Sequence, residues 1–523
     1  MPATVLVPVA LHPARRTATF GRVDAPATPT TDAAEPGTRM NVLFITLDQF
    51  RGDSMSCAEH PVVQTPNLDR LAAAGVRLAR HYSQAAPCGP GRAALYTGTY
   101  QMNNRVVWNG TPLDHRFDTI GLAARRAGYR PALFGYTDQS LDPRDADGPD
   151  DPRLSTYEGV LPGFDEVLDL TGDHGPWLEW LRALGYDPGS SAEQALRGEP
   201  GRPAEHSVSA FLTQRAIEWM GEQHEPWFAH LSYLRPHPPY AAAGTWAGRY
   251  DPADVGMPIE VAADGRHPLH DVLLATRESA APTDERAMRR LRAQYFGMIS
   301  EVDDQLGRLW RWLEETGQWD RTVIVVTADH AEMLGDHGLM SKVGYWESSF
   351  HILGLVRDPR HPETAGTVVD AFTENVDIVP TVCDAMGVPT PLQCDGRSLM
   401  PFLRGDAPER WRDGAHWEFD WRYLAIRRGV GVWPEDRRPE RLHLAVLRQA
   451  DAAYVQFGDG SSRCFDLAAD PTWRTELVDP ARVLALAQAM LTWRSQHTDR
   501  TFSDWLNEDG GIGRAVPAFG HAG

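Results

Sequence analysis

The chain has 523 residues, of which 42% are hydrophobic and 23% are charged, and its formal net charge is −20 at pH 7. This composition is typical of a globular protein with a sizeable core. The acidic balance argues against nucleic acid as a partner, because phosphate backbones bind to basic surfaces. No stretch approaches the roughly 18–20 consecutive apolar residues of a membrane-spanning helix, so we expect no membrane segment.

Residues 1–39 are expected to form a disordered N-terminal extension, because residues 17–39 are rich in Thr, Ala, Pro and Asp. The apolar piece Val5–Leu11 is too short for a signal peptide, and its arginines follow it instead of preceding it. Translation could begin at Met1 or at Met40, which directly precedes the first predicted strand.

The cysteines are odd in number and have no CxxC spacing. A disulfide framework is not expected in so large a chain. We therefore predict free thiols, a reducing compartment and a cytoplasmic location. The cysteines are Cys57, Cys88, Cys383, Cys394 and Cys464.

Strand and helix patterns alternate along the first two thirds of the chain. Continuous apolar runs indicate strands that are buried on both faces, and runs with a period near 3.6 indicate amphipathic helices. This alternation predicts the α/β class, with a large, mainly parallel sheet sandwiched by helices. In chain order we expect a strand at Asn41–Leu47, helices at Asn67–Ala74 and Thr119–Gly128, a strand at Ala132–Gly135, a helix at Ser207–Gln223, a strand at Trp227–Leu234, a helix at Thr283–Glu315 and a strand at Thr322–Thr327.

Two inserts and a change of pattern divide the chain. Residues 139–205 and 236–280 are rich in Pro, Gly and Asp, and we expect long loops over one edge of the sheet. From residue 411 the elements become shorter, with a strand at Tyr454–Phe457 and a late helix at Pro480–Gln496. The chain is therefore predicted to consist of a large α/β domain at residues 40–410 and a smaller α+β domain at residues 411–523.

Polar pairs follow two of the predicted strands. Asp48-Gln49 comes after the first strand, and Asp329-His330 comes after the strand at Thr322–Thr327. Ligands collect at the carboxyl ends of parallel strands, so the two pairs could meet in space. Two carboxylates, an amide and an imidazole suit a divalent cation. Alternatively, the two aspartates are helix caps.

The segment Pro87–Tyr96 contains Cys88-Gly-Pro-Gly-Arg92, which we interpret as a turn running into a helix at Ala93–Tyr96. A side chain at a helix N-terminus faces a partial positive charge, which binds anions and lowers the pKa of a thiol. Arg92 adds a cation that can bind an anion with two hydrogen bonds. The segment is therefore either a thiolate site or a buried cysteine in a tight turn.

These motifs together resemble the sulfatase family of the alkaline phosphatase superfamily. Cys88-Gly-Pro-Gly-Arg92 is similar to the Cys-x-Pro-x-Arg signature, whose cysteine is oxidised to formylglycine. The resemblance covers roughly residues 41 to 475, and its details are most similar to the phosphonate monoester hydrolase and arylsulfatase branch. Further segments that resemble the family in the same order are Asn41–Asp48, Thr65–Gly75, Arg235–Tyr240, Thr327–Lys342, Val376–Gly405 and Phe465–Pro471.

Two details, Gln49 and His330, are similar to that branch, and two positions, Gly91 and Leu353, depart from the family pattern. Gln49 stands where many sulfatases have a second Asp, and His330 stands where many have Asn. Gly91 stands where the signature most often has Ser, a difference that we expect to affect the extent of Cys88 oxidation. Leu353 stands where relatives often have a proline, which concerns packing more than chemistry.

The resemblance implies a formylglycine- and metal-dependent hydrolase of sulfate esters, or of phosphonate monoesters and phosphodiesters, that works through a covalent intermediate on modified Cys88. It also implies a separate formylglycine-generating enzyme for maturation, a small anionic ester as substrate, and a homo-oligomer. One divalent metal, Ca²⁺, Mn²⁺ or Mg²⁺, would be bound. Its implied ligands are Asp48, Gln49, Asp329 and His330.

The remaining implied site residues surround the signature. Arg92 would hold the modified side chain, while His237 and Lys342 would stabilise the substrate's oxygens or help the leaving group depart. Lys342 is the one lysine among 51 basic residues, so a compact ammonium group is expected to be needed there. Weaker implied positions in the substrate pocket are Asn109, Tyr136 and Thr137.

Two other functions remain open. One is an alkaline phosphatase type of phosphohydrolase, with two metals and an unmodified Cys88. The other is a binding protein that has the fold but no activity. Formylglycine at Cys88 lowers the mass by about 18 Da, so intact mass distinguishes the first hypothesis from the second.

Overall fold

The computed structural model describes residues 39–262, 265–427, 438–498, 505–506 and 514–515. The predicted N-terminal extension, residues 1–39, lies outside this range except for Arg39, as does most of the chain after Thr498. The described residues between Met40 and Thr498 belong to one compact unit. The division at residue 411 stays a prediction.

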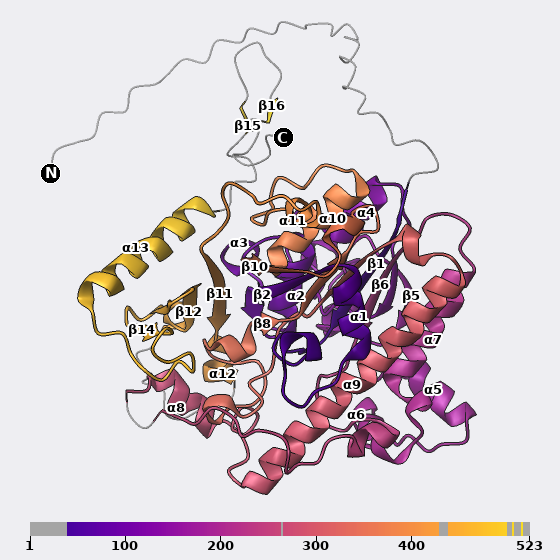
Figure 1. Ribbon diagram of the computed structural model, residues 1–523, viewed down its shortest axis with the longest axis horizontal. Coiled ribbons are helices and arrows are strands. Elements are labelled where there is room, and N and C mark those ends of the chain that lie inside the picture. Colours follow the sequence, from indigo (N-terminus) through magenta and orange to yellow (C-terminus); the bar gives the residue numbers. More distant parts are fainter. Residues whose placement is uncertain (1–38, 263–264, 428–437, 499–504, 507–513, 516–523) are drawn as a thin grey trace, which may run out of the picture. The chain divides into compact units, whose positions relative to one another are not determined.

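The larger sheet is mainly parallel, as predicted (Figure 1). The strands β7, β1, β6 and β4 are neighbours at its centre and run parallel, whereas β9 runs antiparallel to both of its neighbours. The order across the sheet is β10 (Thr367–Glu374), β2 (Val76–Tyr82), β9 (Gly354–Arg357), β7 (Thr322–Thr327), β1 (Asn41–Leu47), β6 (Phe228–Tyr233), β4 (Ala132–Gly135) and β5 (Asp165–Asp169), with β8 (His351–Ile352) paired to β2.

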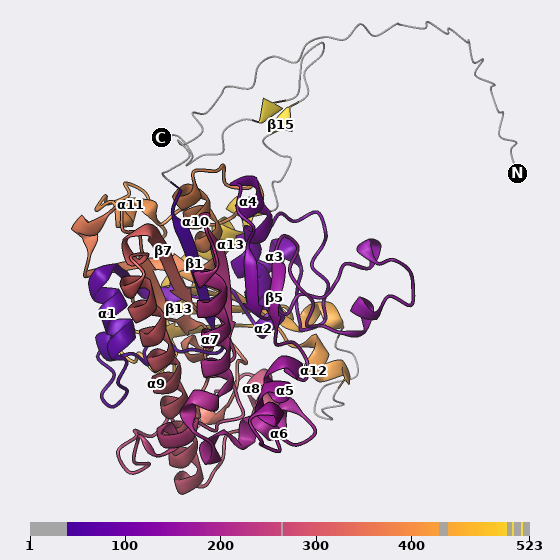
Figure 2. The same ribbon diagram turned by 90° about the vertical axis from the view of Figure 1, so that its right-hand side faces the viewer.

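Helices cover both faces of this sheet. Because side chains alternate along a strand, Leu43, Ile45 and Leu47 pack with α1, α7 and α9, while Val42 and Phe44 pack with α2, α4 and α10. Figure 2 shows α7 and α9 on the outside of the sheet. The helices are α1 (Pro66–Ala74), α2 (Cys88–Thr97), α3 (Gln101–Asn104), α4 (Ile120–Arg126), α5 (Gly175–Ala183), α6 (Ala192–Arg197), α7 (Val208–Gly221), α8 (Pro268–Ala275), α9 (Glu285–Glu315), α10 (Ile378–Met386), α11 (Met400–Leu403), α12 (Arg422–Arg427) and α13 (Pro480–Gln496).

The prediction of long loops is wrong for the first insert, whereas the second insert is largely loop up to residue 267. Residues 139–205 contribute β5, which pairs with β4 at the sheet edge, as well as α5 and α6. Residues 236–280 contain α8. The strand β5 escapes a pattern search because it is short and charged, and Leu168 is its one buried residue.

A smaller sheet lies beside the larger one. Its order is β14 (Ser462–Asp466), β13 (Ala452–Phe457), β12 (His443–Gln449), β11 (Gly414–Asp420) and β3 (Ala85–Ala86), and α13 packs on it through Leu486, Met490 and Trp493. The strand β3 ends two residues before Cys88, so this sheet also supports the signature segment. A separate pair is β15 (Trp505–Leu506) with β16 (Arg514–Ala515). Among the described residues, no helix combines the length and the apolar composition that crossing a membrane requires.

Candidate active site

Four neighbouring parallel strands deliver predicted site residues to one edge of the larger sheet. Asp329 follows β7, Asp48 follows β1, His237 follows β6 and Tyr136 follows β4. All four positions lie at carboxyl ends, where open α/β sheets bind ligands. The sheet therefore brings together residues that are far apart in the sequence.

The helix α2 brings the signature to the same edge. It begins at Cys88 itself, so the expected boundary at Ala93 is wrong. Pro90 is tolerated in the first turn because backbone N–H groups there have no partner within the helix. A β-carbon on Gly91 would lie 2.5 Å from the carbonyl oxygen of Asp329 and 2.9 Å from that of Ala85. Glycine thus allows a close approach between α2 and the end of β7.

The thiol of Cys88 does not have the lowered pKa that its position suggested. Burial, followed by the charge of Asp48, raises the pKa of Cys88 well above its usual range. These effects outweigh the nearby ammonium of Lys342, which acts in the opposite direction. An unmodified Cys88 is therefore a neutral thiol, which is a weak nucleophile.

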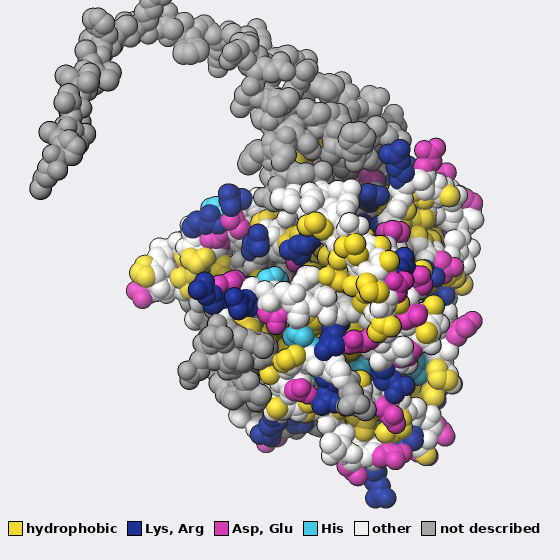
Figure 3. All heavy atoms as spheres, turned by 90° about the vertical axis from the view of Figure 1, so that its left-hand side faces the viewer, with side chains coloured by type: hydrophobic (Ala, Val, Ile, Leu, Met, Phe, Trp, Pro, Cys, Tyr) yellow, Lys and Arg dark blue, Asp and Glu magenta, His cyan; other side chains and the backbone are white. Residues whose placement is uncertain are grey.

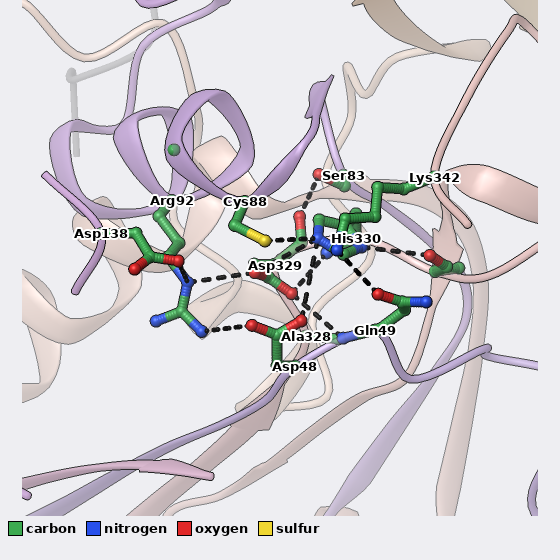
Figure 4. Close-up of polar contacts among 12 residues, drawn as sticks. Asp48, Gln49, Ser83, Cys88, Arg92, Asp138, Ala328, Asp329, His330 and Lys342 are labelled. Atoms are coloured by element: carbon green, nitrogen blue, oxygen red, sulfur yellow. Dashed lines mark hydrogen bonds and ion pairs between the residues drawn. The ribbon is translucent and has the colours of Figure 1, made fainter. Parts of the chain in front are cut away.

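Cys88 belongs to a cluster of metal-type donors. One donor atom each from Asp48, Cys88, Asp329 and His330 lies within 4.8 Å of the others, and these side chains converge in Figure 4. His330 Nε2 lies 3.3 Å from Cys88 Sγ, 3.5 Å from Asp329 Oδ2 and 3.8 Å from Asp48 Oδ1. Carboxylate and imidazole donors at these spacings suit one divalent cation.

The buried carboxylates of this cluster favour the binding of a cation. Asp48 Oδ1 is buried and has no hydrogen-bond partner among the described residues, which is unfavourable for a carboxylate unless a positive charge faces it. Burial and the neighbouring charge of Asp48 raise the pKa of Asp329 to about 7. Two adjacent buried carboxylates do not both ionise readily. A bound divalent metal would allow both to do so, and the residues fit one.

His330 presents a nitrogen to the cluster in the form that metals bind. Its Nδ1 lies 3.1 Å from the carbonyl oxygen of Ala331, so Nδ1–H can donate there and leave Nε2 as an acceptor. Burial and the charge of Lys342 lower the pKa of His330 to about 3. The imidazole is therefore neutral at pH 7.

Gln49 lies beside the cluster between two charged side chains. Its backbone N–H donates to Asp329 Oδ1 at 3.2 Å. Its amide nitrogen donates to the buried carboxylate of Glu332, and its Oε1 accepts from Lys342 Nζ at 2.8 Å. Glu332 thus orients the amide so that Oε1, the atom that can bind a metal, faces the site.

Arg92 is completely buried and joins both carboxylates. Its Nε donates to Asp329 Oδ2 at 3.0 Å, and its Nη2 donates to Asp48 Oδ2 at 3.1 Å. Its Nη1 donates to Ser232 Oγ at 2.8 Å and to the carbonyl oxygen of Tyr136 at 3.0 Å. The guanidinium also lies 4.4 Å from the centre of the Tyr136 ring. Arg92 therefore fixes the orientation of the carboxylates.

The hydroxyl groups of Tyr136 and Thr137 are bonded within the protein. Tyr136 donates to Asp48 Oδ2 at 2.7 Å. Thr137 donates to the carbonyl oxygen of Gly159 and accepts from the N–H of Leu161, both at 2.8 Å. Tyr136 thus supports the cluster, and Thr137 anchors the first insert.

Lys342 and Asn109 lie at the boundary between the cluster and a pocket of about 680 Å³. Asn109 Oδ1 accepts from the N–H of Gly89 at 2.8 Å. Burial lowers the pKa of Lys342, but the neighbouring acidic groups, among them Asp48 and Asp329, outweigh it, and the net shift is upward. The ammonium is therefore charged at the inner end of the pocket. Apolar and aromatic lining residues include Trp108, Leu141, Leu154, Tyr157 and Tyr423.

His237 lies in the loop after β6 and is half-buried. Its Nδ1 lies 2.8 Å from the carbonyl oxygen of Pro238. Burial, then the charge of Lys342, lowers the pKa of His237 to about 3, and Asp48 acts in the opposite direction. The imidazole is therefore close enough to the cluster to interact with its charges.

Sequence reasoning missed two acidic residues. Glu332 accepts hydrogen bonds from Gln49 and from the backbone N–H groups of Leu334 and Ser341. Asp138 lies 3.8 Å from Arg92 Nε, and burial raises its pKa to about 7. Asp138 follows β4, so the same strand-end argument could have identified it.

Several other polar residues lie outside the cluster. Asp336 accepts from Arg51 Nη1 at 2.9 Å, and His337 stacks on Trp346. Both therefore have structural partners. The cysteines other than Cys88, namely Cys57, Cys383, Cys394 and Cys464, are free thiols.

Comparison with known proteins gives consistent matches. A family model described as Sulfatase matches residues 40–388. The "Multifunctional alkaline phosphatase superfamily protein PehA" of Trinickia caryophylli is 37% identical over 514 residues, which cover 91% of this chain and 99% of that protein. The crystal structure of a phosphonate monoester hydrolase of Agrobacterium radiobacter has 40% identity and a TM-score of 0.84, and the match covers 92% of this chain and 100% of that one. The structure of a phosphonate monoester hydrolase from Silicibacter pomeroyi has 36% identity and a TM-score of 0.79, and the match covers 91% of this chain and 99% of that one.

Proposed function

The chain belongs to the sulfatase family and is a hydrolase of sulfate esters or phosphonate monoesters, and from this premise we propose that it requires a formylglycine made from Cys88 and one divalent metal. The observation that carries the proposal is the position of Cys88 among Asp48, Asp329 and His330. A buried, neutral thiol is a weak nucleophile at this point, whereas a hydrated aldehyde has two oxygen atoms there.

The formylglycine and the metal would supply different parts of the chemistry. The formylglycine, as its hydrate, would supply the attacking oxygen, and the metal would supply a Lewis acid that lowers the pKa of an oxygen it binds. Asp48, Asp329, His330 Nε2 and Gln49 Oε1 would hold the metal. Arg92 keeps the two carboxylates in a fixed orientation, so little reorganisation is needed when the substrate binds.

Lys342 and His237 are proposed to act on the ester. The ammonium of Lys342 can approach one nonbridging oxygen, where negative charge accumulates in the transition state. A bound anion favours the protonated form of His237, which can then donate from Nε2 to the departing oxygen.

The pocket supports a leaving group with apolar surface. Its lining includes Trp108, Leu154 and Tyr157. Besides Lys342 it contains the cation Arg153, which is already paired with Asp147 and Asp151. Sulfate esters, phosphonate monoesters and phosphodiesters each carry one negative charge, and we include all three among the substrates. Assays with nitrophenyl sulfate, phenylphosphonate and phosphodiester at one pH would rank them.

Two alternatives are less well supported. A two-metal phosphohydrolase needs a second set of ligands, and the other group of metal-type donors in the described part of the chain is Asp114, His115 and Asp142. Asp114 already pairs with Arg116 and Arg144. A binding protein without activity would have no need for a complete set of polar donors around Cys88.

The proposal is tested on Cys88 directly. Peptide mass spectrometry should find residue 88 about 18 Da lighter than cysteine, and Cys88→Ala should abolish turnover while leaving metal content unchanged. An unmodified Cys88 in a fully active preparation would refute the formylglycine requirement. Activity should also depend on whether the expression host has a formylglycine-generating enzyme.

A homo-oligomer and a cytoplasmic location complete the proposal. On α13, Leu484 and Leu491 are 59% and 66% exposed, and hydrophobic side chains are visible at the surface on this side in Figure 3. Exposed apolar surface of this kind supports contact with a second copy, which light scattering would test. The five free cysteines support a reducing compartment.

A further inference from the structure

Arg235, two residues before His237, bonds mainly to the loop that carries this histidine. Its Nη1 donates to the carbonyl oxygens of His237 at 3.0 Å and Pro239 at 2.9 Å, and its Nη2 donates to that of Ala241 at 3.2 Å. The side chain is completely buried. Three carbonyl groups of one loop therefore converge on a single guanidinium, which holds the loop in a closed bend.

Glu199 connects this bend to the rest of the fold. Its carboxylate is also completely buried and pairs with Arg235 Nη2. The other carboxylate oxygen accepts from the N–H of Val208 at 2.8 Å, which is the first residue of α7. Glu199 thus links the His237 loop to the N-terminus of a helix that packs on the sheet.

This ion pair is poorly explained by stability alone. Removing two charges from water costs several kcal/mol, and their mutual attraction often only offsets that loss. A second buried carboxyl group, Glu301 on α9, accepts from the N–H of Ala243 at 3.0 Å, and burial, followed by the charge of Glu199, raises its pKa to about 7. The geometric constraint on the loop is the clearer gain.

We infer that Arg235 and Glu199 are positioning residues that hold the His237 imidazole in place for departure of the leaving group. The inference rests on the proposed function, in which His237 donates to the departing oxygen. It adds two residues outside the cluster that act through His237. Glu199 lies in the first insert, so this insert has a role beyond lining the pocket.

The test uses the loss of activity across leaving groups of different acidity. A misplaced proton donor matters most for poorly acidic leaving groups, because good ones depart without a proton. We measure kcat/KM per formylglycine for a series of substituted phenyl sulfates or phosphonates. Glu199→Gln should lower it on the order of 10-fold for the least acidic phenol and little for the most acidic one. His237→Ala should steepen the dependence further.

A second positioning variant and a control for general loss of stability complete the test. Arg235→Lys keeps the charge but cannot reach all three carbonyl groups, so it should steepen the dependence as Glu199→Gln does. Asp358→Asn disturbs another buried carboxylate, which pairs with Arg360 after β9. This variant should lower the melting temperature without changing the dependence on leaving-group acidity.

The outcomes separate the two ideas. The dependence of kcat/KM on leaving-group acidity could become steeper in His237→Ala but stay parallel to the wild type in Glu199→Gln and Arg235→Lys. That result would overturn the positioning inference alone. A His237→Ala profile parallel to the wild type would overturn the role of His237 in the proposed function, and the inference with it. Steepened profiles for all three variants would support both.

Discussion

Gly91→Ser restores the commonest form of the signature, yet we expect it to impair this enzyme. The new β-carbon would lie 2.5 Å from the carbonyl oxygen of Asp329, whereas a carbon–oxygen contact needs about 3.3 Å. Asp329 or α2 must therefore move by about 0.8 Å, since the contact is with backbone and not with a flexible side chain. Overpacking of this kind costs about 1–3 kcal/mol of stability. A displacement near 1 Å at a catalytic centre can lower kcat/KM on the order of 10²-fold.

The assay must separate maturation from catalysis. We expect formylglycine content at least equal to the wild type, but weaker metal binding and a kcat/KM per formylglycine that is lower by roughly one to two orders of magnitude. Gly221→Ala is the matched control, because its β-carbon would meet only Trp312 at 3.9 Å, and it should not reduce stability or activity. If Gly91→Ser has wild-type kcat/KM per formylglycine and wild-type metal affinity, the crowding argument is wrong.

Three further substitutions probe the cluster. Asp329→Ala should lose both metal and activity, because it removes a charged ligand; a stoichiometric metal content by elemental analysis would show that the site is misassigned. Lys342→Arg should lower kcat/KM per formylglycine on the order of 10²-fold, because a planar guanidinium cannot replace a positioned ammonium, and an unchanged value would leave the single lysine without a catalytic role. Tyr136→Phe removes the 2.7 Å hydrogen bond to Asp48 and should weaken metal affinity on the order of 10-fold; an unchanged titration curve would contradict this.

The central strands were predictable because they are buried on both faces. Asn41–Leu47 and Thr322–Thr327 are continuous apolar runs, and both match the observed strands without a shift. Polar residues directly after such strands also predicted where Asp48 and Asp329 meet. Elements that are only partly buried were missed. An example is β5, whose charged sequence has no clear hydrophobic period.

Contacts between residues that are far apart in the sequence could not be predicted from its hydrophobic pattern or its motifs. Glu332 lies within a segment that resembled the family, but its bond to Gln49 requires two strands to be side by side. The raised pKa of Cys88 could not be predicted for the same reason. The position of Cys88 at a helix start can be read from the neighbouring sequence, but the carboxylates near it come from distant parts of the chain. Arg235 and Glu199 likewise are 36 residues apart; Arg235 begins a segment that resembles the family, whereas Glu199 lies in none of the motifs.

The burial of Cys88 has a consequence for the timing of protein synthesis. In the folded protein its side chain is 5% exposed, and the strand β1 that helps to form its surroundings lies between β6 and β7. The last of these partners, β7, ends at Thr327, so the fold cannot close around Cys88 until that residue has left the ribosome. At about 5–20 residues per second, roughly 10–50 s pass between the synthesis of Cys88 and that of Thr327. An enzyme that oxidises Cys88 would therefore have at least this interval in which the side chain is accessible. Slower translation through the intervening segment would then raise the fraction of molecules that become active.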